Sequence, residues 1–289
     1  MELLLYNAFN GLIQGVFYAL MALGVALILS LNAVVNFAHG GFLIIGAYLA
    51  FTLTPWLGFW GALVAGPVLA GVLGLAVERV LVRPLYRRPD PIYTLLLTFG
   101  LALIMEDVAR TVWGAEGLPF AVPDWLNTPV SESLFFVTQY RLVVVGITAL
   151  AVLGLFALLR YTRLGIRIRA GIRDLETVSM LGVNIYVLRG LNFALGCFFA
   201  GLAGVLAAGI LGLTPTMGAS LVMPSFVAVI VGGVGSLVGA VLGGLIIGLA
   251  SGITTTYYPP ASEAVMYLIM AVVLVLRPRG LLGHEGLFE

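Results

Sequence analysis

VVNFAHGGFLIIGAYLA, residues 34–50, places Asn36, His39 and the adjacent glycines Gly40 and Gly41 inside otherwise strongly apolar sequence. Apolar residues lead into this stretch from Leu20 and continue beyond it through Phe51. Burying a polar side chain among apolar groups without a hydrogen bond costs several kcal/mol. Whether these polar residues are tolerated therefore depends on the solvent in which the chain folds.

The composition indicates that this solvent is a lipid bilayer. Of the 289 residues, 61% are hydrophobic and only 9% are charged, against about 25% charged residues in a typical soluble domain. So few charges cannot cover the water-facing surface of a chain of this size. The predicted fold class is all-α, a polytopic integral membrane bundle in which glycines break some of the helices.

Apolar stretches of about 20 residues are long enough to cross a membrane as helices. One stretch, 223–256, is too long for a single crossing, because roughly 34 residues extend about 50 Å against a hydrocarbon core of about 30 Å. The glycine-rich GGVGSLVG, residues 232–239, is expected to divide it in two. We therefore expect eight or nine membrane segments: about 8–30, 37–54, 58–82, 93–113, 141–159, 189–212 and 262–277, with two more inside 223–256.

The arginines predict the orientation of these segments, since basic residues concentrate in cytoplasmic loops. Segment 114–140 holds acidic residues and no basic one, so it is expected outside. If every segment crosses the membrane fully, the loops alternate between its two sides and the N-terminus is predicted to lie outside. A re-entrant segment near residue 37 would place the N-terminus inside. The arginines expected in the cytoplasm form three clusters: Arg79, Arg83, Arg87 and Arg88; Arg160, Arg163, Arg167, Arg169, Arg173 and Arg189; and Arg277 with Arg279.

Small residues recur every fourth position in three of the segments. In lipid, such stripes let helix backbones approach closely. They serve packing inside one subunit or contact between subunits, and spacing alone does not separate these uses. The stripes are Gly58, Ala62, Gly66, Ala70 and Gly74; Gly196, Ala200, Gly204, Ala208 and Gly212; and Gly232, Ser236, Ala240, Gly244, Gly248 and Gly252.

Residues 160–189 are too charged to cross a membrane, yet their apolar residues fall at helical spacing. They predict a short amphipathic cytoplasmic helix that ends near Gly182. Its apolar face would lie on anionic lipid or dock into the groove of a soluble partner. The apolar positions are Leu164, Ile168, Ile172, Leu175, Val178 and Leu181.

Several of these stretches together resemble the LivH-type permease subunits of bacterial branched-chain amino acid ABC importers. The resemblance covers nearly the whole chain, and its most specific block is NFAHG. It is carried by residues 11–51, by GIRIRAGIRDLETVSMLGVN (165–184), by LNFALGCFFAGLAGVLAAG (191–209), by FVAVIVGGVGSLVGAVLGGLIIG (226–248) and by RPRGLLG (277–283).

The resemblance implies a single transmembrane permease domain, residues 1–289, in the bacterial cytoplasmic membrane. Its implied partners are a LivM-type second permease subunit, two cytoplasmic ATPases that bind ATP and Mg²⁺, and an extracytoplasmic substrate-binding protein. The chain itself would hold no cofactor and catalyse no reaction, and its cargo would be branched-chain amino acids.

The resemblance also makes residues 160–189 the segment that couples the permease to the ATPases, which favours docking over lipid. Such permeases often carry an E-A-A-x-x-x-G motif in this loop, and here Glu176, Thr177, Val178 and Gly182 occupy those places. Both alanines are therefore replaced. The expected coupling residues are Arg169, Asp174, Glu176, Val178, Leu181 and Gly182.

Transporters place broken helices where backbone groups line a cavity, often at corresponding positions of two halves. Here an apolar helix precedes a glycine-interrupted segment twice, which is compatible with an internal repeat. His39 is expected to hold a helix break near the cytoplasmic end through hydrogen bonds, with route lining and proton relay as alternatives. Asn36 is expected to cap a helix or to line the route. The residues expected at helix breaks or along the route are Asn36, His39, Gly40, Gly41, Gly232, Gly233 and Gly235.

Other polar residues are expected to have structural roles. Gln14 in the first segment is expected to bond a neighbouring helix rather than a solute. Glu106 and Arg110 stand four residues apart and are expected to pair with each other.

The sequence disfavours several other functions. Without lysine there is no Walker G-x-x-x-x-G-K-[ST] motif, and the histidines, His39 and His284, are too far apart in sequence to suggest a metal site. No catalytic cluster suggests a membrane enzyme, and no nucleic acid partner is expected. An ion-coupled secondary transporter would need an acidic residue near the membrane centre, and only Glu106 and Asp107 are expected as acidic residues in the spans. A permease of the same family for urea, short amides or other small polar solutes stays open.

Overall fold

The chain folds into a bundle of α-helices. The computed structural model describes residues 2–88, 90–130 and 137–283, and these contain helices and isolated bridges but no β-sheet. Six helices are long and apolar enough to cross a membrane, and two shorter apolar helices accompany them. The all-α polytopic fold predicted from composition is confirmed.

The membrane segments closely follow the predicted apolar stretches. α2 is interrupted at Gly58, whose φ of 67° lies in the left-handed region that favours glycine. α2 therefore has two arms, which correspond to the predicted segments 37–54 and 58–82, and the described residues hold nine segments in all. These belong to α1 (Glu2–Asn32), α2 (His39–Val77), α3 (Ile92–Trp113), α4 (Gln139–Tyr161), α7 (Ile185–Leu211), α8 (Met217–Gly232), α9 (Leu237–Tyr257) and α10 (Ala264–Leu276).

Short elements connect these helices. The second arm of α2 continues through a π-helical turn, Glu78–Val82, and a 3-10 helix, Arg83–Arg87. Two short helices, α5 (Arg163–Arg173) and α6 (Leu175–Met180), lie between α4 and α7. Single 3-10 turns stand at Asp124–Asn127 and Pro259–Ala261.

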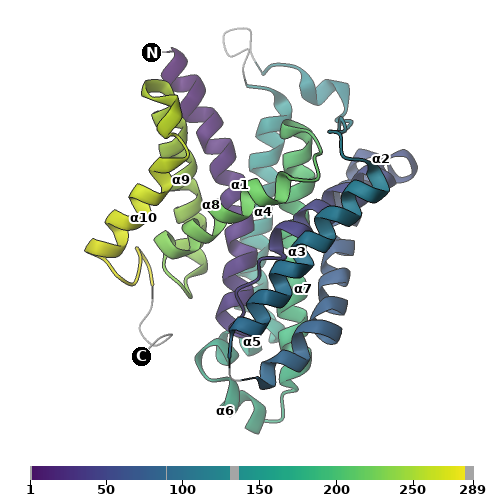
Figure 1. The fold of residues 1–289 in the computed structure, drawn as a ribbon, viewed down its shortest axis with the longest axis vertical. Helices are drawn as coiled ribbons and strands as arrows, with labels where there is room; N and C mark the ends of the chain where they lie inside the picture. The colour runs from purple at the N-terminus through teal and green to yellow at the C-terminus, as the bar shows by residue number, and fades with distance from the viewer. Residues whose placement is uncertain (1, 89, 131–136, 284–289) are drawn as a thin grey trace.

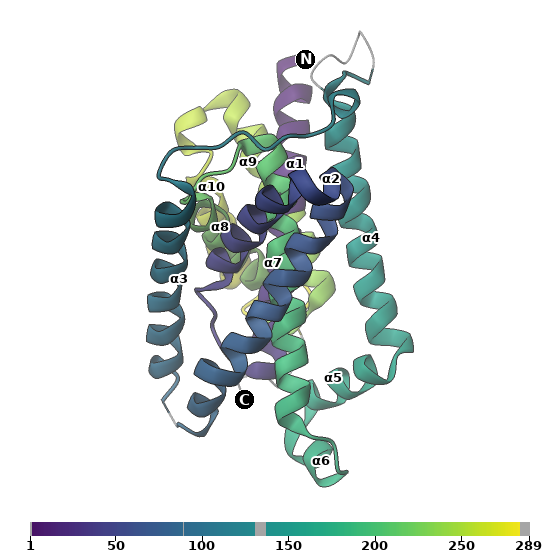
Figure 2. The same cartoon turned by 90° about the vertical axis from the view of Figure 1, so that its right-hand side faces the viewer.

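The two ends of the bundle differ in charge. The N-terminus and the connection between α3 and α4 lie at one end, which we call the outer end (Figures 1 and 2). α5 and α6 lie at the opposite end, which we call the inner end, and they carry four arginines. Since basic residues mark cytoplasmic loops, this arrangement agrees with a cytoplasmic inner end and an N-terminus on the outer side.

The core is formed by α1 and α7, which make the most extensive contacts with α9 and α2 respectively. Small residues make these contacts close. A Cβ atom added to Gly15 would lie 3.0 Å from the Gly244 carbonyl oxygen, and one added to Gly201 would lie 2.7 Å from the Ala70 Cβ. Ala70 and Gly244 belong to two of the small-residue stripes, and a Cβ on Gly196 of the third would lie 2.8 Å from the Gly24 carbonyl oxygen. Members of all three stripes therefore pack inside this one subunit. Gly58 is the exception, because it turns the chain in open space.

The second half of the bundle repeats the first with opposite direction. In the first half, long α1 is followed by the short first arm of α2, a glycine break, the second arm and α3. In the second half, long α7 is followed by short α8, a glycine break, α9 and α10. α1 runs from the outer to the inner end and α7 runs back (Figures 1 and 2). The repeat suggested by the sequence is therefore present as an inverted one, of the kind that many transporters contain.

Candidate functional site

The inner end of the bundle presents a folded module made of α5 and α6. The Thr162 hydroxyl caps α5 by accepting a 3.0 Å hydrogen bond from the Gly165 amide. Gly165 lies so close to the Leu158 and Leu159 backbone of α4 that a Cβ there would collide with it. This close approach lets the chain turn sharply from α4 into α5.

The predicted single amphipathic helix over this segment is wrong in one respect, because Asp174 breaks it. Asp174 adopts extended backbone angles and caps α6, accepting hydrogen bonds from the Thr177 amide at 3.0 Å and from the Thr177 hydroxyl. Hydrogen bonds from the hydroxyl and then the amide lower the pKa of the Asp174 carboxyl below its ordinary value. The capping carboxylate is therefore charged at neutral pH.

The apolar face of the module packs against the membrane helices of this chain, and not on lipid or in a partner's groove, the two uses expected for it. Ile168 and Val178 are buried, and Leu164, Ile172 and Leu175 are half-buried. Gly171 lies against the Leu31 side chain at the inner end of α1. α5 and α6 therefore rest on the bundle rather than hang from it.

Leu181 departs from the predicted face. It is 78% exposed, and its neighbour Met180 is 77% exposed. Gly182 follows with a φ of 82°, and Asn184 caps α7 through the Tyr186 and Val187 amides. The turn lifts two large apolar side chains off the bundle at the tip of the inner end, where Arg169 and Glu176 are also exposed.

A group of polar residues, Asn32, Tyr86, Arg189 and Asn192, ties the inner ends of three elements together; we call it the inner polar cluster. The Asn32 amide nitrogen lies 2.6 Å from the Tyr86 hydroxyl and donates at 3.2 Å to the Arg189 carbonyl. Asn192 donates to Asn32 Oδ1 at 2.9 Å and to the Leu27 carbonyl at 2.7 Å. The Arg189 guanidinium covers the Tyr86 ring at 4.3 Å. The start of α7 is therefore linked directly to the end of α1 and to the 3-10 helix that follows α2.

A buried ion pair stands beside this cluster. Glu78 is fully buried in the π-helical turn, and Arg83 pairs with it at 2.8 Å. Arg83 also donates to the Tyr186 carbonyl at 3.2 Å, which links the pair to α7. The expectation that the spans hold only Glu106 and Asp107 as acidic residues is therefore wrong, because Glu78 lies inside the predicted segment 58–82.

Glu106 and Arg110 do form the predicted pair, at 2.5 Å.

Asn36 and His39 lie deeper in the bundle than predicted. His39 is fully buried, with its imidazole against Gly24 and beside the Met21 main chain, both in α1. These residues precede the inner end of α1 by 8 to 11 positions, which places His39 about 12–16 Å inside it. The Asn36 amide has no hydrogen-bond partner among the described residues, whereas the His39 ring lies at the Met21 main chain. No side-chain hydrogen bond from Asn36 therefore supports the break.

A threonine that the sequence did not point to supports the break instead. The Thr98 hydroxyl of α3 lies 3.3 Å from the Phe37 amide and 3.2 Å from the Val35 carbonyl. It thereby serves two backbone groups of the non-helical segment 33–38, which lipid could not satisfy. Only a polar side chain inside α3 signalled this in the sequence.

Gly40 and Gly41 begin α2 rather than interrupt it. A Cβ on Gly40 would lie 2.8 Å from the Gly218 carbonyl oxygen of α8, and a Cβ on Gly218 would collide with the Gly40 carbonyl. Gly41 faces the Met105 side chain of α3. The first turns of two related helices, α2 and α8, thus cross by backbone contact.

The glycines at the second predicted break do interrupt the chain. α8 ends at Gly232, and Gly233 and Gly235 have φ values of 105° and 89°. The Leu281 and Leu282 amides donate at 2.9 Å to the Val231 and Gly232 carbonyls, so the RPRGLLG segment covers the end of α8. The C-terminal segment therefore closes the second break from the inner side.

The described residues contain no cluster of His, Cys, Asp and Glu that could bind a metal ion, and His284 lies outside them. The inner end instead combines three features: the exposed apolar tip at Met180 and Leu181, the module of α5 and α6 packed on the bundle, and the inner polar cluster, which joins α1, α7 and the 3-10 helix after α2.

Sequence comparisons agree with this architecture. The family model described as "Branched-chain amino acid transport system / permease component" matches residues 7–275. This chain belongs to that permease family. The high-affinity branched-chain amino acid permease protein LivH of Escherichia coli K12 is 32% identical, with 97% of this chain and 96% of that protein covered.

More distant relatives have the same kind of name. BraD of Pseudomonas aeruginosa is 29% identical over 95% of this chain and 94% of that protein. A probable LivH of Methanocaldococcus jannaschii is 27% identical, with 92% and 88% covered. Among solved structures, PsaBC from Streptococcus pneumoniae in complex with Fab aligns with 92% of this chain and 89% of that chain at 16% identity, with a TM-score of 0.46.

Family membership makes this permease a component of a transport system and a multi-pass membrane protein. Two sets of its polar residues were not predicted from the sequence: the inner polar cluster and Thr98. Their partners lie between 54 and 165 positions away in the chain, so no periodicity predicts them. A polar residue within an apolar segment was the one available signal.

Proposed function

We propose that this permease is the transmembrane subunit of a binding-protein-dependent ABC importer that passes branched-chain amino acids inward across the cytoplasmic membrane. The relatives that match almost the whole chain are named as branched-chain amino acid permeases, which supports the proposed cargo. The proposed complex adds a LivM-type second permease, two cytoplasmic ATPases and an extracytoplasmic binding protein. ATP and Mg²⁺ would bind the ATPases and not this chain.

We propose that the segment 160–189 couples this permease to the ATPases, and the exposed apolar tip at Met180 and Leu181 is the observation that supports this. It projects from a module that packs on the inner ends of α1 and α7. An apolar helix end in a groove is a recurrent way to bind a partner. Closure of the ATPases would push this tip, and Asn184 and Arg189 would pass the movement to the inner polar cluster. Arg169, Asp174, Glu176, Val178 and Gly182 complete the proposed coupling set.

We propose that the chain moves at two helix breaks, segment 33–38 before α2 and the glycines between α8 and α9, when the transport route opens. α2 and α8 start inside the bundle and cross at Gly40 and Gly218, with Asn36 and His39 beside the crossing. A lateral shift of α1 would change this crossing directly, since His39 rests on Gly24. Gly232, Gly233 and Gly235 would allow α8 and α9 to adjust at the inner end. We propose that these residues line or gate the route.

The coupling proposal is tested by placing negative charge on the tip. In the assembled transporter, Leu181→Glu together with Gly182→Glu is expected to reduce ATP-driven leucine uptake at least tenfold while the chain still inserts. The matched control is Arg88→Glu, which adds negative charge to another exposed inner-end residue and should leave uptake within twofold. Normal uptake by the tip variant would refute the coupling assignment.

A second experiment separates the energy sources. Uptake of labelled leucine is expected to stop on ATP depletion and to persist with a protonophore or sodium ionophore. The opposite pattern would favour an ion-coupled transporter. Competition by excess isoleucine and valine, without competition by urea or acetamide, is expected for the proposed cargo.

A further inference from the structure

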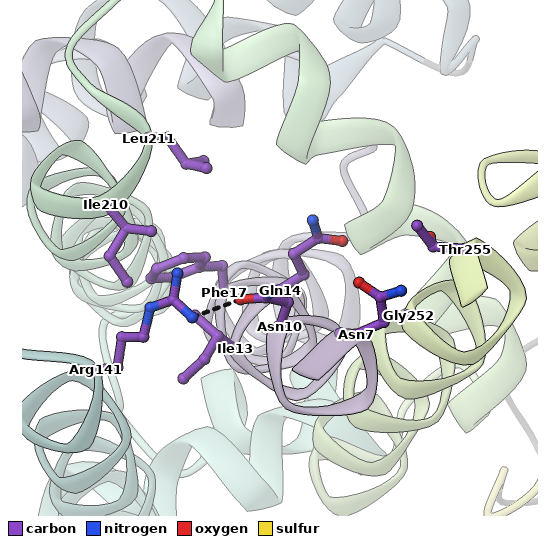
Figure 3. Close-up of a pocket in the computed structure, with 11 residues that line it drawn as sticks. Asn7, Asn10, Ile13, Gln14, Phe17, Arg141, Ile210, Leu211, Gly252 and Thr255 are labelled. Carbon is purple, nitrogen blue, oxygen red and sulfur yellow. Dashed lines mark hydrogen bonds between the residues drawn. The ribbon is translucent and has the colours of Figure 1, made fainter. Parts of the chain in front are cut away.

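A pocket opens at the outer end of the bundle, away from the coupling module. Its cavity of about 340 Å³ lies between α1, the start of α4, the end of α7 and α9. Figure 3 shows its lining residues converging on one space from these separate helices. This volume is at the lower end of the range for small-molecule sites.

The pocket lining contains one charged residue, Arg141, which lies beside the Asn10 amide. Its Nη1 donates to Asn10 Oδ1 at 2.5 Å, and its remaining N–H groups leave room for an anion. Asn10 is a neutral partner, so it does not cancel the guanidinium charge. A carboxylate is the ligand that a guanidinium fork binds best among the groups of a small solute.

Two further amides, those of Asn7 and Gln14, lie across the pocket from Arg141 (Figure 3) and supply acceptors. Asn7 donates its amide hydrogen to Thr256 Oγ1 at 3.2 Å, which leaves its carbonyl oxygen as an acceptor. Gln14 is exposed at the pocket rather than bonded to a neighbouring helix, so the expectation for this residue is wrong. The Asn7 and Gln14 amides face the same space in Figure 3. Such oxygens suit an ammonium group.

The apolar part of the pocket lining lies on the same side as Arg141 (Figure 3). It consists of Ile13 and Phe17 of α1 and Ile210 and Leu211 of α7. Leu211 is 51% exposed, so an apolar group that covers it would leave water. One guanidinium, two amide oxygens and an apolar wall together match an α-amino acid with an apolar side chain.

We infer that this outer pocket is the site where the permease receives its solute, with Arg141 binding the α-carboxylate, Asn7 and Gln14 binding the ammonium group, and the apolar wall holding the side chain. The inference rests on the proposed function, because it takes an amino acid as the cargo. It assigns recognition to the permease itself, before the route through the bundle. The phosphate of a lipid headgroup is the other source of an anion here.

Protection of a single thiol tests the inference. On a Cys197→Ser background, Leu211→Cys would be alkylated with a water-soluble maleimide in the assembled transporter with its binding protein, without ATP. Saturating leucine is expected to slow alkylation at least fivefold. Leucinol, which lacks the carboxylate, is expected to give no protection.

Arginine variants decide the role of the guanidinium. Arg141→Gln is expected to abolish the protection by leucine, and Arg141→Lys to retain part of it. The control is Arg110→Gln, another outer-end arginine, which pairs with Glu106 and lies outside the pocket; it should keep full protection. Thermal unfolding of each variant shows whether it is folded.

Each outcome has a separate meaning. If the Leu211→Cys transporter takes up leucine but leucine does not protect the thiol, or protects the Arg141→Gln variant equally, the pocket inference is wrong and the proposed function stands. If protection follows anionic lipid content and ignores leucine, the pocket holds a headgroup and the inference is wrong. If the unmodified transporter takes up no branched-chain amino acid, the proposed function fails, and the assigned solute fails with it.

Discussion

At the scale of single residues, the backbone crossing of α2 and α8 leaves no space for a side chain. Gly40→Leu is expected to reduce stability by at least about 1–3 kcal/mol, the usual cost of overpacking, because its Cβ would lie 2.8 Å from the Gly218 carbonyl oxygen. Gly154→Leu is the control, since Gly154 has no atom within 4 Å of an added Cβ. Thermal unfolding in detergent measures both, and equal melting temperatures would contradict the crossing.

The buried pair of Glu78 and Arg83 provides a second test at this scale. Arg83→Gln leaves a fully buried carboxylate without its partner, and we expect a loss of about 3 kcal/mol, at the low end of the usual range because Arg83 is 26% exposed. Glu78→Gln in the same chain should restore much of this loss, as measured by chemical denaturation. The exposed pair supplies the comparison: Arg110→Gln should cost less than about 1 kcal/mol. Additive effects of the two substitutions would argue against a direct pair.

At the scale of elements, the short helix α6 depends on its cap. Asp174→Ala is expected to fray residues 174–182 and to weaken ATPase docking, while Asp174→Asn should retain the cap because asparagine caps helices equally well. Hydrogen exchange of this segment measures the effect. Because the pKa of Asp174 is lowered in the folded protein, its contribution is complete above about 3.9, the ordinary pKa of aspartate, and is lost as the pH falls through the lowered value. Protection should therefore not change between pH 8 and pH 5.

The elements themselves were largely predictable from the sequence, and their polar links were not. Length and apolarity alone set the membrane segments, so the breaks at Gly58 and at 233–236 fell where expected. The amphipathic pattern of residues 160–189 was correct for Ile168 and Val178 and wrong for Leu181, because a cap at Asp174 and a turn at Gly182 reset the helical phase. The depth of His39 was missed because it depends on the path of segment 33–38, which Thr98 supports from another helix.

At the scale of the whole molecule, the inverted repeat and the module of α5 and α6 share the helices α1 and α7. The repeat places two short helices, the first arm of α2 and α8, across each other inside the bundle, held by long helices on either side. The module rests on the inner ends of α1 and α7, the first long helix of each half. In the proposed transport cycle, a push at the inner end would therefore reach both halves at once.

The arrangement of the helices also predicts which segments lie on the same side of the membrane, and thiol labelling can measure this directly. On the Cys197→Ser background, Leu3→Cys and Glu116→Cys should react with a membrane-impermeant maleimide added to intact cells, because both positions are exposed at the outer end. Met180→Cys should react only after permeabilisation, since its exposed side chain lies at the inner end. Reaction of Leu3→Cys and Glu116→Cys from opposite sides would require an odd number of crossings between them. In that case α2 could not hold two arms, and the crossing at Gly40 and Gly218 would lose its basis.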